Sequence, residues 1–281
     1  MKYIDATKGS AIALVVFVLL VYFVPGAGPS GEVELILTVS TFLFAIIVGF
    51  YLSRLNNRYD KMRELIASED SSWLSLYQES AFLGPEFQSH VREIIDSYYV
   101  SAYDFRIGEH KTYTERYIQD IYKELASEQR DGFKAENAFD KISDLLKDLQ
   151  RARNEVTVVT LEKLTMGQWA ILLLLSGIIL FCLFYLKIDV LYSQVIVILL
   201  STVLVLLLLL LRDLQNFLLG GKSVVEESGQ QVFDSIGKLR YYPEVYLAKH
   251  NVHLPWHVKE HRVGHHVAGE AHKMEIRKAS K

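Results

Sequence analysis

Three bulky apolar residues, Phe42, Ile46 and Phe50, recur at intervals of four within a long apolar run. Because a helix repeats about every 3.6 residues, this spacing predicts that they share one helix face. Where several copies of a chain meet at an axis, stacked rings of such side chains can gate an aqueous path by wetting and dewetting. Alternatively the row faces lipid or packs against a neighbouring helix, and the spacing alone does not choose between these arrangements.

Polar residues lie at both ends of this row. At one end, Glu34 could raise the local cation concentration, and the hydroxyls of Thr38 and Thr41 could contact a partly dehydrated ion. At the other end, Arg54 and Arg58 could form a positive ring that repels cations or attracts anions. Each type also has a structural alternative: a solvated charge at a helix start, a hydroxyl bonded to the helix backbone, or an arginine against lipid headgroups.

A second group of candidate ligands lies near the C-terminus, where seven of the nine histidines fall in the last 32 residues. His257, His261 and His265 follow one another at intervals of four, so on a helix their imidazoles could share a zinc or nickel ion. A basic, His-rich tail could also contact an anionic membrane in a pH-dependent way. The simplest expectation is a disordered polar tail without a resident cofactor.

The chain carries no recognisable catalytic motif. It has no Ser–His–Asp order, nucleophile elbow, P-loop or HExxH sequence, so we do not expect an enzyme. Its single cysteine, Cys182, lies in an apolar run and excludes a disulfide framework within the chain. The net charge of −3 does not suggest a nucleic-acid partner, and the basic residues gather at the edges of apolar runs instead.

Four apolar runs are long enough to predict membrane-spanning helices. A Pro- and Gly-rich turn separates the first two runs and three residues separate the last two, so we expect two hairpins. The first run could be a signal peptide, but its bulky end and the prompt return of apolar sequence favour an uncleaved anchor. The runs are residues 10–24, the apolar stretch that begins at Val33, residues 169–186 and residues 190–211.

Positive charges predict the orientation of these helices. The link between the first two runs has no Lys or Arg, and the link between the last two has only Lys187. We therefore expect both termini and the long middle segment in the cytoplasm, with both hairpin tips outside. The flanks on the expected cytoplasmic side carry many more basic residues, among them Lys2, Lys8, Arg54, Arg58, Lys61, Arg63, Arg212 and Lys222.

These patterns predict an all-α integral membrane protein with a helical cytoplasmic domain between the second and third membrane helices. The helix that begins at Val33 continues without a proline into this domain, and the domain runs on into the third membrane helix. The expected parts are helices one and two (1–53), the cytoplasmic helical domain (54–166), helices three and four (167–212), an amphipathic helix region (213–249) and a basic, His-rich mobile tail (250–281).

The segment AIIVGFYLSRLNNRY resembles the pore helix of bestrophin channels, in which Gly-Phe-Tyr precedes a basic-aromatic cluster. The matching residues here are Gly49, Phe50 and Tyr51, followed by Arg58 and Tyr59. The whole chain is more similar to a bacterial family described as bestrophin-like, with a comparable layout of helices. That family has an Asp-Arg-Pro-Phe-Ser-Gly motif after its fourth helix, which corresponds here to residues 213–217 followed by Gly220 and Gly221.

This resemblance implies a ring of five subunits whose second helix lines a neck, with Phe42, Ile46 and Phe50 at the neck positions. The acidic run that serves bestrophins as a calcium clasp is absent, since only Glu226, Glu227 and Asp234 follow helix four closely. We therefore expect an oligomeric, pentameric ion channel of the bacterial inner membrane that conducts inorganic ions, with a leaning towards cations. The alternative is a membrane-anchored sensor or scaffold without a pore, and a third hypothesis is a metal-handling transporter loaded by its His-rich tail.

Overall fold

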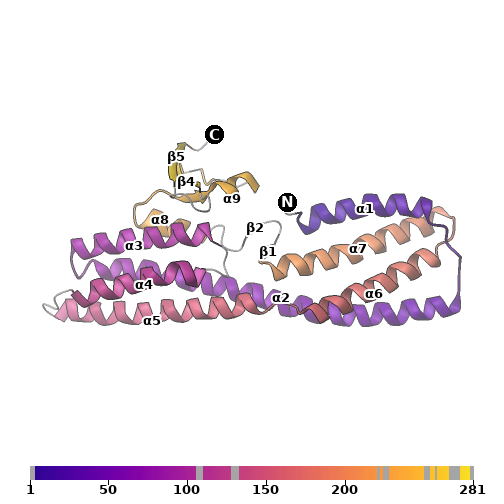
Figure 1. Ribbon diagram of the computed structural model, residues 1–281, viewed down its shortest axis with the longest axis horizontal. Helices are drawn as coiled ribbons and strands as arrows, with labels where there is room; N and C mark the ends of the chain where they lie inside the picture. Colours follow the sequence, from indigo (N-terminus) through magenta and orange to yellow (C-terminus); the bar gives the residue numbers. More distant parts are fainter. Residues whose placement is uncertain are drawn as a thin grey trace. The chain divides into compact units, whose positions relative to one another are not determined.

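A computed structural model describes residues 4–105, 110–127, 133–219, 222–223, 228–249, 254–256, 258–265 and 273–278, and is mostly helical (Figure 1). The chain divides into two compact units. Unit 1 comprises residues 1–60 and 163–223, and unit 2 comprises residues 61–162 and 224–281. Helix α2 (Gly31–Ser80) contributes residues to both units as one uninterrupted helix, as its sequence predicted.

Within the described residues, four helices are long and apolar enough to cross a membrane: α1 (Ala6–Phe23), α2, α6 (Met166–Tyr185) and α7 (Leu191–Gln215). Local capping sets where two of them begin. The Asp5 side chain accepts a hydrogen bond from the Lys8 amide at the start of α1. Thr165 and Gln168 form a reciprocal capping box at the start of α6. Helix α1 therefore begins four residues earlier than its apolar run indicated.

The four helices of unit 1 do not pack in chain order. Helix α1 packs most extensively along α7, which in turn packs against α6, so α7 lies between α1 and α6 (Figure 1). Helix α1 thus has α7 as its main neighbour, although α2 follows it directly in the sequence. The shared core is apolar and draws on all four helices, with Val21, Phe44, Val48, Leu55, Leu172, Ile179, Val197, Leu204 and Leu211 among its buried residues.

The link between α1 and α2 and the link between α6 and α7 meet at one end of unit 1. The amides of Ala27 and Gly28 donate to the Tyr185 carbonyl oxygen at 2.8 and 3.2 Å. The Lys187 ammonium is buried and donates to the carbonyl oxygens of Val21 and Val24 at 2.6 and 2.8 Å. Lys187 therefore satisfies the last carbonyls of α1, where the helix dipole favours a cation.

Unit 2 is built on a helical bundle. The second half of α2 packs with α3 (Pro85–Asp104), α4 (His110–Ser127) and α5 (Phe133–Leu161). Each helix buries an apolar stripe, and the centre is rich in aromatic residues, with Trp73, Phe87, Tyr98, Ile121 and Leu146 fully buried.

The C-terminal part of unit 2 contains a small sheet that the sequence analysis did not anticipate. Strand β4 (Glu260–His265) pairs in parallel with β3 (Tyr241–Pro243) and antiparallel with β5 (Lys273–Lys278). Two short helices, α8 (Gln230–Ser235) and α9 (Glu244–Lys249), belong to the same part. The all-α prediction therefore missed this sheet, in which the paired residues of β3 and β4 are 21 positions apart and those of β4 and β5 are 8 to 18 apart. A two-stranded ladder of β1 (Leu218–Leu219) and β2 (Lys222–Ser223) follows α7 in unit 1.

The contact between the two links yields a stability prediction. A Cβ atom added at Gly26 would overlap the Lys187 carbonyl oxygen, whereas one added at Gly31 would meet nothing within 4 Å. Gly26→Ala should therefore lower the stability of the detergent-solubilised protein by about 1–3 kcal/mol, as overpacking does elsewhere. Gly31→Ala, the matched control, should be neutral or slightly stabilising. Equal thermal unfolding of the two variants would contradict the close approach of the links.

Candidate functional site

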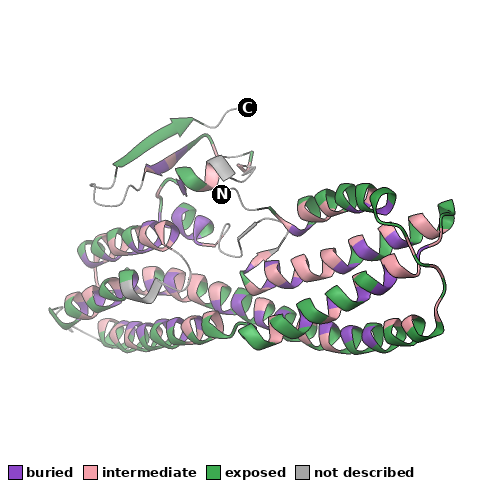
Figure 2. Cartoon of the chain, turned by 45° about the vertical axis from the view of Figure 1, so that its right-hand side comes forward, coloured by how far each residue is buried: buried purple, intermediate pink, exposed green. Residues whose placement is uncertain are grey.

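The membrane part of α2 has one buried face and one uncovered face (Figure 2). Phe44, Val48 and Leu55 lie in the core of unit 1, with exposed fractions of 5%, 5% and 1%. On the opposite face, Phe42, Ile46 and Phe50 are 66%, 54% and 66% exposed. The row predicted from sequence spacing is therefore the part of α2 that the chain's own helices leave uncovered.

Most of the flanking polar residues predicted from the sequence also lie on the uncovered side of α2. Glu34, Thr38, Thr41 and Arg54 are all exposed. The Thr38 hydroxyl donates to the Glu34 carbonyl oxygen at 2.8 Å, which is the backbone bond considered above as its structural alternative. This bond uses the hydroxyl proton, and the lone pairs of the oxygen remain available as acceptors.

Helices α6 and α7 present a different kind of surface. In both helices, no exposed residue carries a charge, an amide or an aliphatic hydroxyl, and large apolar side chains such as Leu174, Phe181 and Leu199 predominate. The uncovered face of α2 instead combines aromatic and aliphatic side chains with carboxylates, hydroxyls and a guanidinium. The composition of these surfaces distinguishes α2 from the two helices that it packs with.

Arg58 does not join Arg54 on the uncovered face. Its side chain is buried, with 4% exposure for the residue, and its Nη1 donates to the Gln215 carbonyl oxygen at 2.9 Å. The guanidinium lies 4.0 Å from the centre of the Phe217 ring, a cation–π contact. The structure therefore separates two arginines that the sequence analysis grouped as one positive ring.

Gln215 connects Arg58 to the start of α6. The side-chain oxygen of Gln215 accepts hydrogen bonds from the Trp169 indole at 3.0 Å and from the Leu164 amide at 3.2 Å. We call Arg58, Trp169, Gln215 and Phe217 the Arg58 joint. The resemblance described above placed Arg58 and the 213–217 stretch in two separate motifs, and only the fold brings them together.

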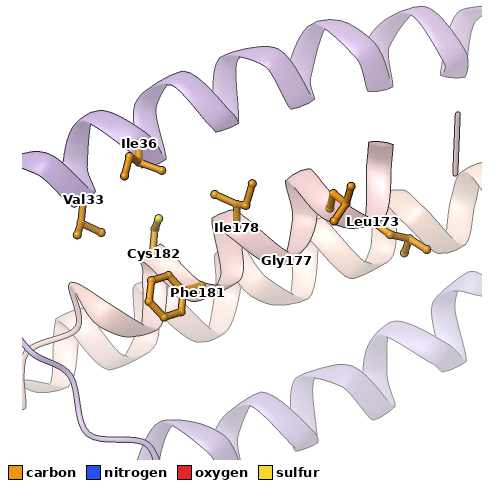
Figure 3. A pocket seen from close by; sticks show the side chains of 8 residues that line it. Val33, Ile36, Leu173, Gly177, Ile178, Phe181 and Cys182 are labelled. Atoms are coloured by element: carbon orange, nitrogen blue, oxygen red, sulfur yellow. The ribbon is translucent and has the colours of Figure 1, made fainter. Parts of the chain in front are cut away.

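An apolar groove lies between the first turns of α2 and the second half of α6 (Figure 3). Its lining offers no charged or hydrogen-bonding side chain other than the Cys182 thiol, so it has no chemistry for holding an ion. The lining residues are Val33, Ile36, Leu173, Leu174, Gly177, Ile178, Phe181 and Cys182.

The predicted histidine ligands are distributed differently from the helical arrangement that the sequence suggested. His257 lies outside the described residues, and His261 and His265 lie on strand β4. His265 Nδ1 is 2.7 Å from Glu244 Oε2, and this contact raises the pKa of His265. Among the described residues, no group of three or more possible ligands is arranged to hold a metal ion. A divalent metal at the tail stays a prediction.

A half-buried acidic group in unit 2 was missed by the sequence analysis. Asp70, beyond the apolar part of α2, accepts hydrogen bonds from the Tyr99 hydroxyl (2.6 Å), the Ser228 hydroxyl (3.1 Å) and the Gly229 amide (3.1 Å). Burial raises the pKa of Asp70 to about 6, despite these donors, and the adjacent Glu69 carboxylate adds to the increase.

The neighbouring Glu69 forms an ion pair with Arg153. Arg153 Nη2 lies 3.0 Å from the Glu69 carboxylate, and the guanidinium stacks 4.5 Å from the centre of the Tyr98 ring. Burial raises the pKa of Glu69 even though Arg153 opposes this shift. In the part of the chain that the structure describes, no ion pair joins Asp70 to a cation, so hydroxyl and amide donors alone balance its charge.

Comparison with known proteins identifies the family of the chain. The model of the bestrophin-like domain matches residues 10–228, which is more than three quarters of the chain. The chain belongs to the bestrophin-like family. No curated protein and no solved structure matches it.

The bestrophin-like match covers α2, α6, α7 and the bundle α3–α5 completely and α1 from residue 10, and it ends just before α8. The residues beyond it are nevertheless part of the core of unit 2. Val232, Phe233 and Ile236 are almost completely buried against the aromatic side of α3, and the rings of Phe233 and Tyr99 are 5.8 Å apart. In this member of the bestrophin-like family, the C-terminal segment therefore completes the helical bundle.

The position of Asp70 predicts a pH-dependent contribution to stability. Because its pKa of about 6 lies above the ordinary value of 3.8, the folded state binds the proton more tightly. Its contribution is therefore fully present below about pH 4 and is lost as the pH rises through about 6. Asp70→Asn should stabilise the protein relative to wild type at pH 8 by at most about 3 kcal/mol, and should do so less at pH 4.

Urea unfolding of both proteins between these pH values measures the difference. Asp148→Asn is the control, since Asp148 is exposed and its side chain pairs only at 3.5 Å with Arg151. A difference between Asp70→Asn and wild type that does not vary with pH would show that the hydrogen bonds of Asp70, and not its ionisation, determine its effect.

Proposed function

We propose that this bestrophin-like protein forms an oligomeric ion channel in which α2 lines the pore. Phe42, Ile46 and Phe50 form the neck, Glu34, Thr38 and Thr41 lie at one mouth, and Arg54 lies at the other. The observation that carries the proposal is the uncovered, mixed face of α2. The membership of the family supports it independently.

The composition of this face favours a pore axis over a lipid contact. Each polar group placed in the hydrocarbon of a bilayer raises the free energy of the protein. A helix face that contacts lipid is therefore expected to lack carboxylates and hydroxyls. If several copies assemble with these faces inward, the polar residues at both ends meet water and the apolar residues between them meet one another. A pentamer, as in the bestrophins that the sequence resembles, is the assembly we propose.

The distribution of charge on the same face supports cation conduction. Glu32 and Glu34 are both exposed in the first turn of α2, and repetition around a ring would concentrate cations there. At the other end, Arg58 is buried in the Arg58 joint, so Arg54 is the one arginine of the predicted pair that remains on this face. The positive ring is therefore weaker than the sequence suggested.

We place the protein in the bacterial inner membrane with both termini and the helical part of unit 2 in the cytoplasm. The distribution of Lys and Arg carries this orientation. Lys187, the only basic residue in the α6–α7 link, is buried and donates to backbone carbonyl oxygens of α1. It therefore adds no exposed positive charge to the link, which supports this orientation.

The neck can be tested by comparing two phenylalanines of equal exposure. Phe50 and Phe181 are 66% and 65% exposed, and each has a tyrosine ring about 6 Å away on its own helix. Phe50→Ala should widen the neck in every subunit and raise the conductance in planar bilayers, because water then persists in the constriction. Phe181→Ala, on α6, should leave the conductance unchanged.

The two variants must be shown to assemble as wild type does, by cross-linking and by native mass in detergent. A rise in ion flux for Phe50→Ala alone supports the neck. If purified wild-type protein carries no current under any ionic condition and exists as a dimer, the channel should be abandoned for the membrane-anchored scaffold.

The orientation has its own test. Single cysteines at Ser30 and Ser127, in a Cys182→Ser background, should react with a membrane-impermeant thiol reagent from opposite sides of sealed vesicles. Ser30 lies in the link before α2, and Ser127 is an exposed residue at the end of α4. We expect Ser127→Cys to react only from the cytoplasmic side. Labelling of both from outside would overturn the orientation and, with it, the assignment of the two mouths.

A further inference from the structure

The rotation of α2 about its own axis decides which residues would face the pore. Successive residues on a helix are offset by about 100°, so a turn of that size would replace Phe42, Ile46 and Phe50 with their chain neighbours. The core contacts of α2 in unit 1 are made by apolar side chains, which are not directional. A directional contact lies at Arg58, three residues beyond the buried Leu55, where the side chain is buried against α7.

The two partners of Arg58, Gln215 and Phe217, lie at the end of α7 and in the turn that follows it. The acceptor is the carbonyl oxygen of Gln215, the last residue of α7, where unpaired carbonyls and the helix dipole favour a cation. The ring beneath the guanidinium belongs to Phe217, which is buried and has a φ of 55°. This left-handed backbone is rarely adopted by a bulky residue. It occurs at the turn that follows α7, where the Phe217 ring lies under Arg58.

The same joint includes the start of α6. The side-chain oxygen of Gln215 accepts hydrogen bonds from Trp169 and from the Leu164 amide. Gln215 therefore contacts Arg58 through its backbone carbonyl and the start of α6 through its side chain. The ring of Tyr59, next to Arg58, lies 6.5 Å from that of Phe217. Three of the four membrane helices therefore meet at the Arg58 joint.

We propose that Arg58 is a positioning residue that fixes the rotation of α2 against α6 and α7, and so holds Phe42, Ile46 and Phe50 on the uncovered face. The role of the row in conduction rests on the proposed function, but the rotation itself does not. An arginine suits this task because its planar guanidinium can donate hydrogen bonds in its plane and stack on an aromatic ring. A lysine retains a donor for Gln215 and lacks the flat surface for Phe217.

The test uses the groove between α2 and α6 as a gauge of rotation. Ile36 and the native Cys182 line this groove from opposite helices (Figure 3). The Ile36→Cys protein is treated with bifunctional thiol reagents of increasing length. The measured quantity is the length of the shortest reagent that cross-links the new cysteine to Cys182, which we call the span. The same measurement is then made with Arg58→Gln, Arg58→Lys or Phe217→Leu added. Arg54→Gln is the control, since Arg54 lies on the uncovered face and outside the joint.

We expect Arg58→Gln and Phe217→Leu to lose cross-linking by the shortest reagent and to require a longer one. Arg58→Lys should fall between them and wild type, and Arg54→Gln should match wild type. A residue with only a general effect on stability would lower the melting temperature without changing this span. An unchanged span in both Arg58→Gln and Phe217→Leu, with assembly intact, would overturn the inference.

Ion flux measured on the same proteins separates this inference from the proposed function. If the span changes and the flux changes with it, both are supported. If the span changes while the wild type carries no current, Arg58 still positions α2 and the channel is rejected. If the span is constant while the wild type conducts, the channel stands and the positioning role fails.

Discussion

A bilayer core offers no water to a helix end, so every span must have its terminal amides and carbonyls satisfied near the membrane surface. In unit 1 the chain does this with side chains from other helices. Lys187, in the link after α6, donates hydrogen bonds to the last carbonyl oxygens of α1. At the start of α1, the Ala6 amide donates to the carboxylate of Asp213, which lies near the end of α7, at 2.8 Å. Arg58, on α2, takes the Gln215 carbonyl at the end of α7. Each of these polar contacts ties two helices together where apolar packing alone would let them slide.

This arrangement leaves α2 bound on one side only. Phe44, Val48 and Leu55 enter the core, and the Arg58 joint lies on the same side. The opposite face carries Phe42, Ile46 and Phe50 between polar residues, a composition that suits neither hydrocarbon nor bulk water along its whole length. The assembly of several copies proposed above would bring these faces together and remove the mismatch.

Unit 2 balances its buried and half-buried charges in two ways. Arg153 pairs with Glu69 and stacks on Tyr98, whereas Asp70 depends on hydroxyl groups and one amide. Both donors that Asp70 takes from beyond α7, Ser228 and Gly229, lie where the family match ends and the C-terminal segment begins. That segment adds Phe233 to the core and, through Arg262, a bidentate ion pair to Asp96 on α3. The bundle and the C-terminal segment are therefore stabilised by apolar and ionic contacts together.

The sequence by itself determined the features that depend on local periodicity and composition. Hydropathy located the four spans, and the spacing of Phe42, Ile46 and Phe50 placed them on one face.

The sequence could not tell which face of α2 would be buried, because that depends on the helices that pack against it. For the same reason it grouped Arg58 with Arg54, and it treated Lys187 as a loop charge. Asp70 gave no signal, since its partners are 29 and 158 residues away in the chain. The sheet β3–β5 was missed because its strands are only three to six residues long and because β3 pairs with β4 across 21 residues. Burial, ion pairing and strand pairing arise from contacts between distant segments, so only the tertiary structure decided them.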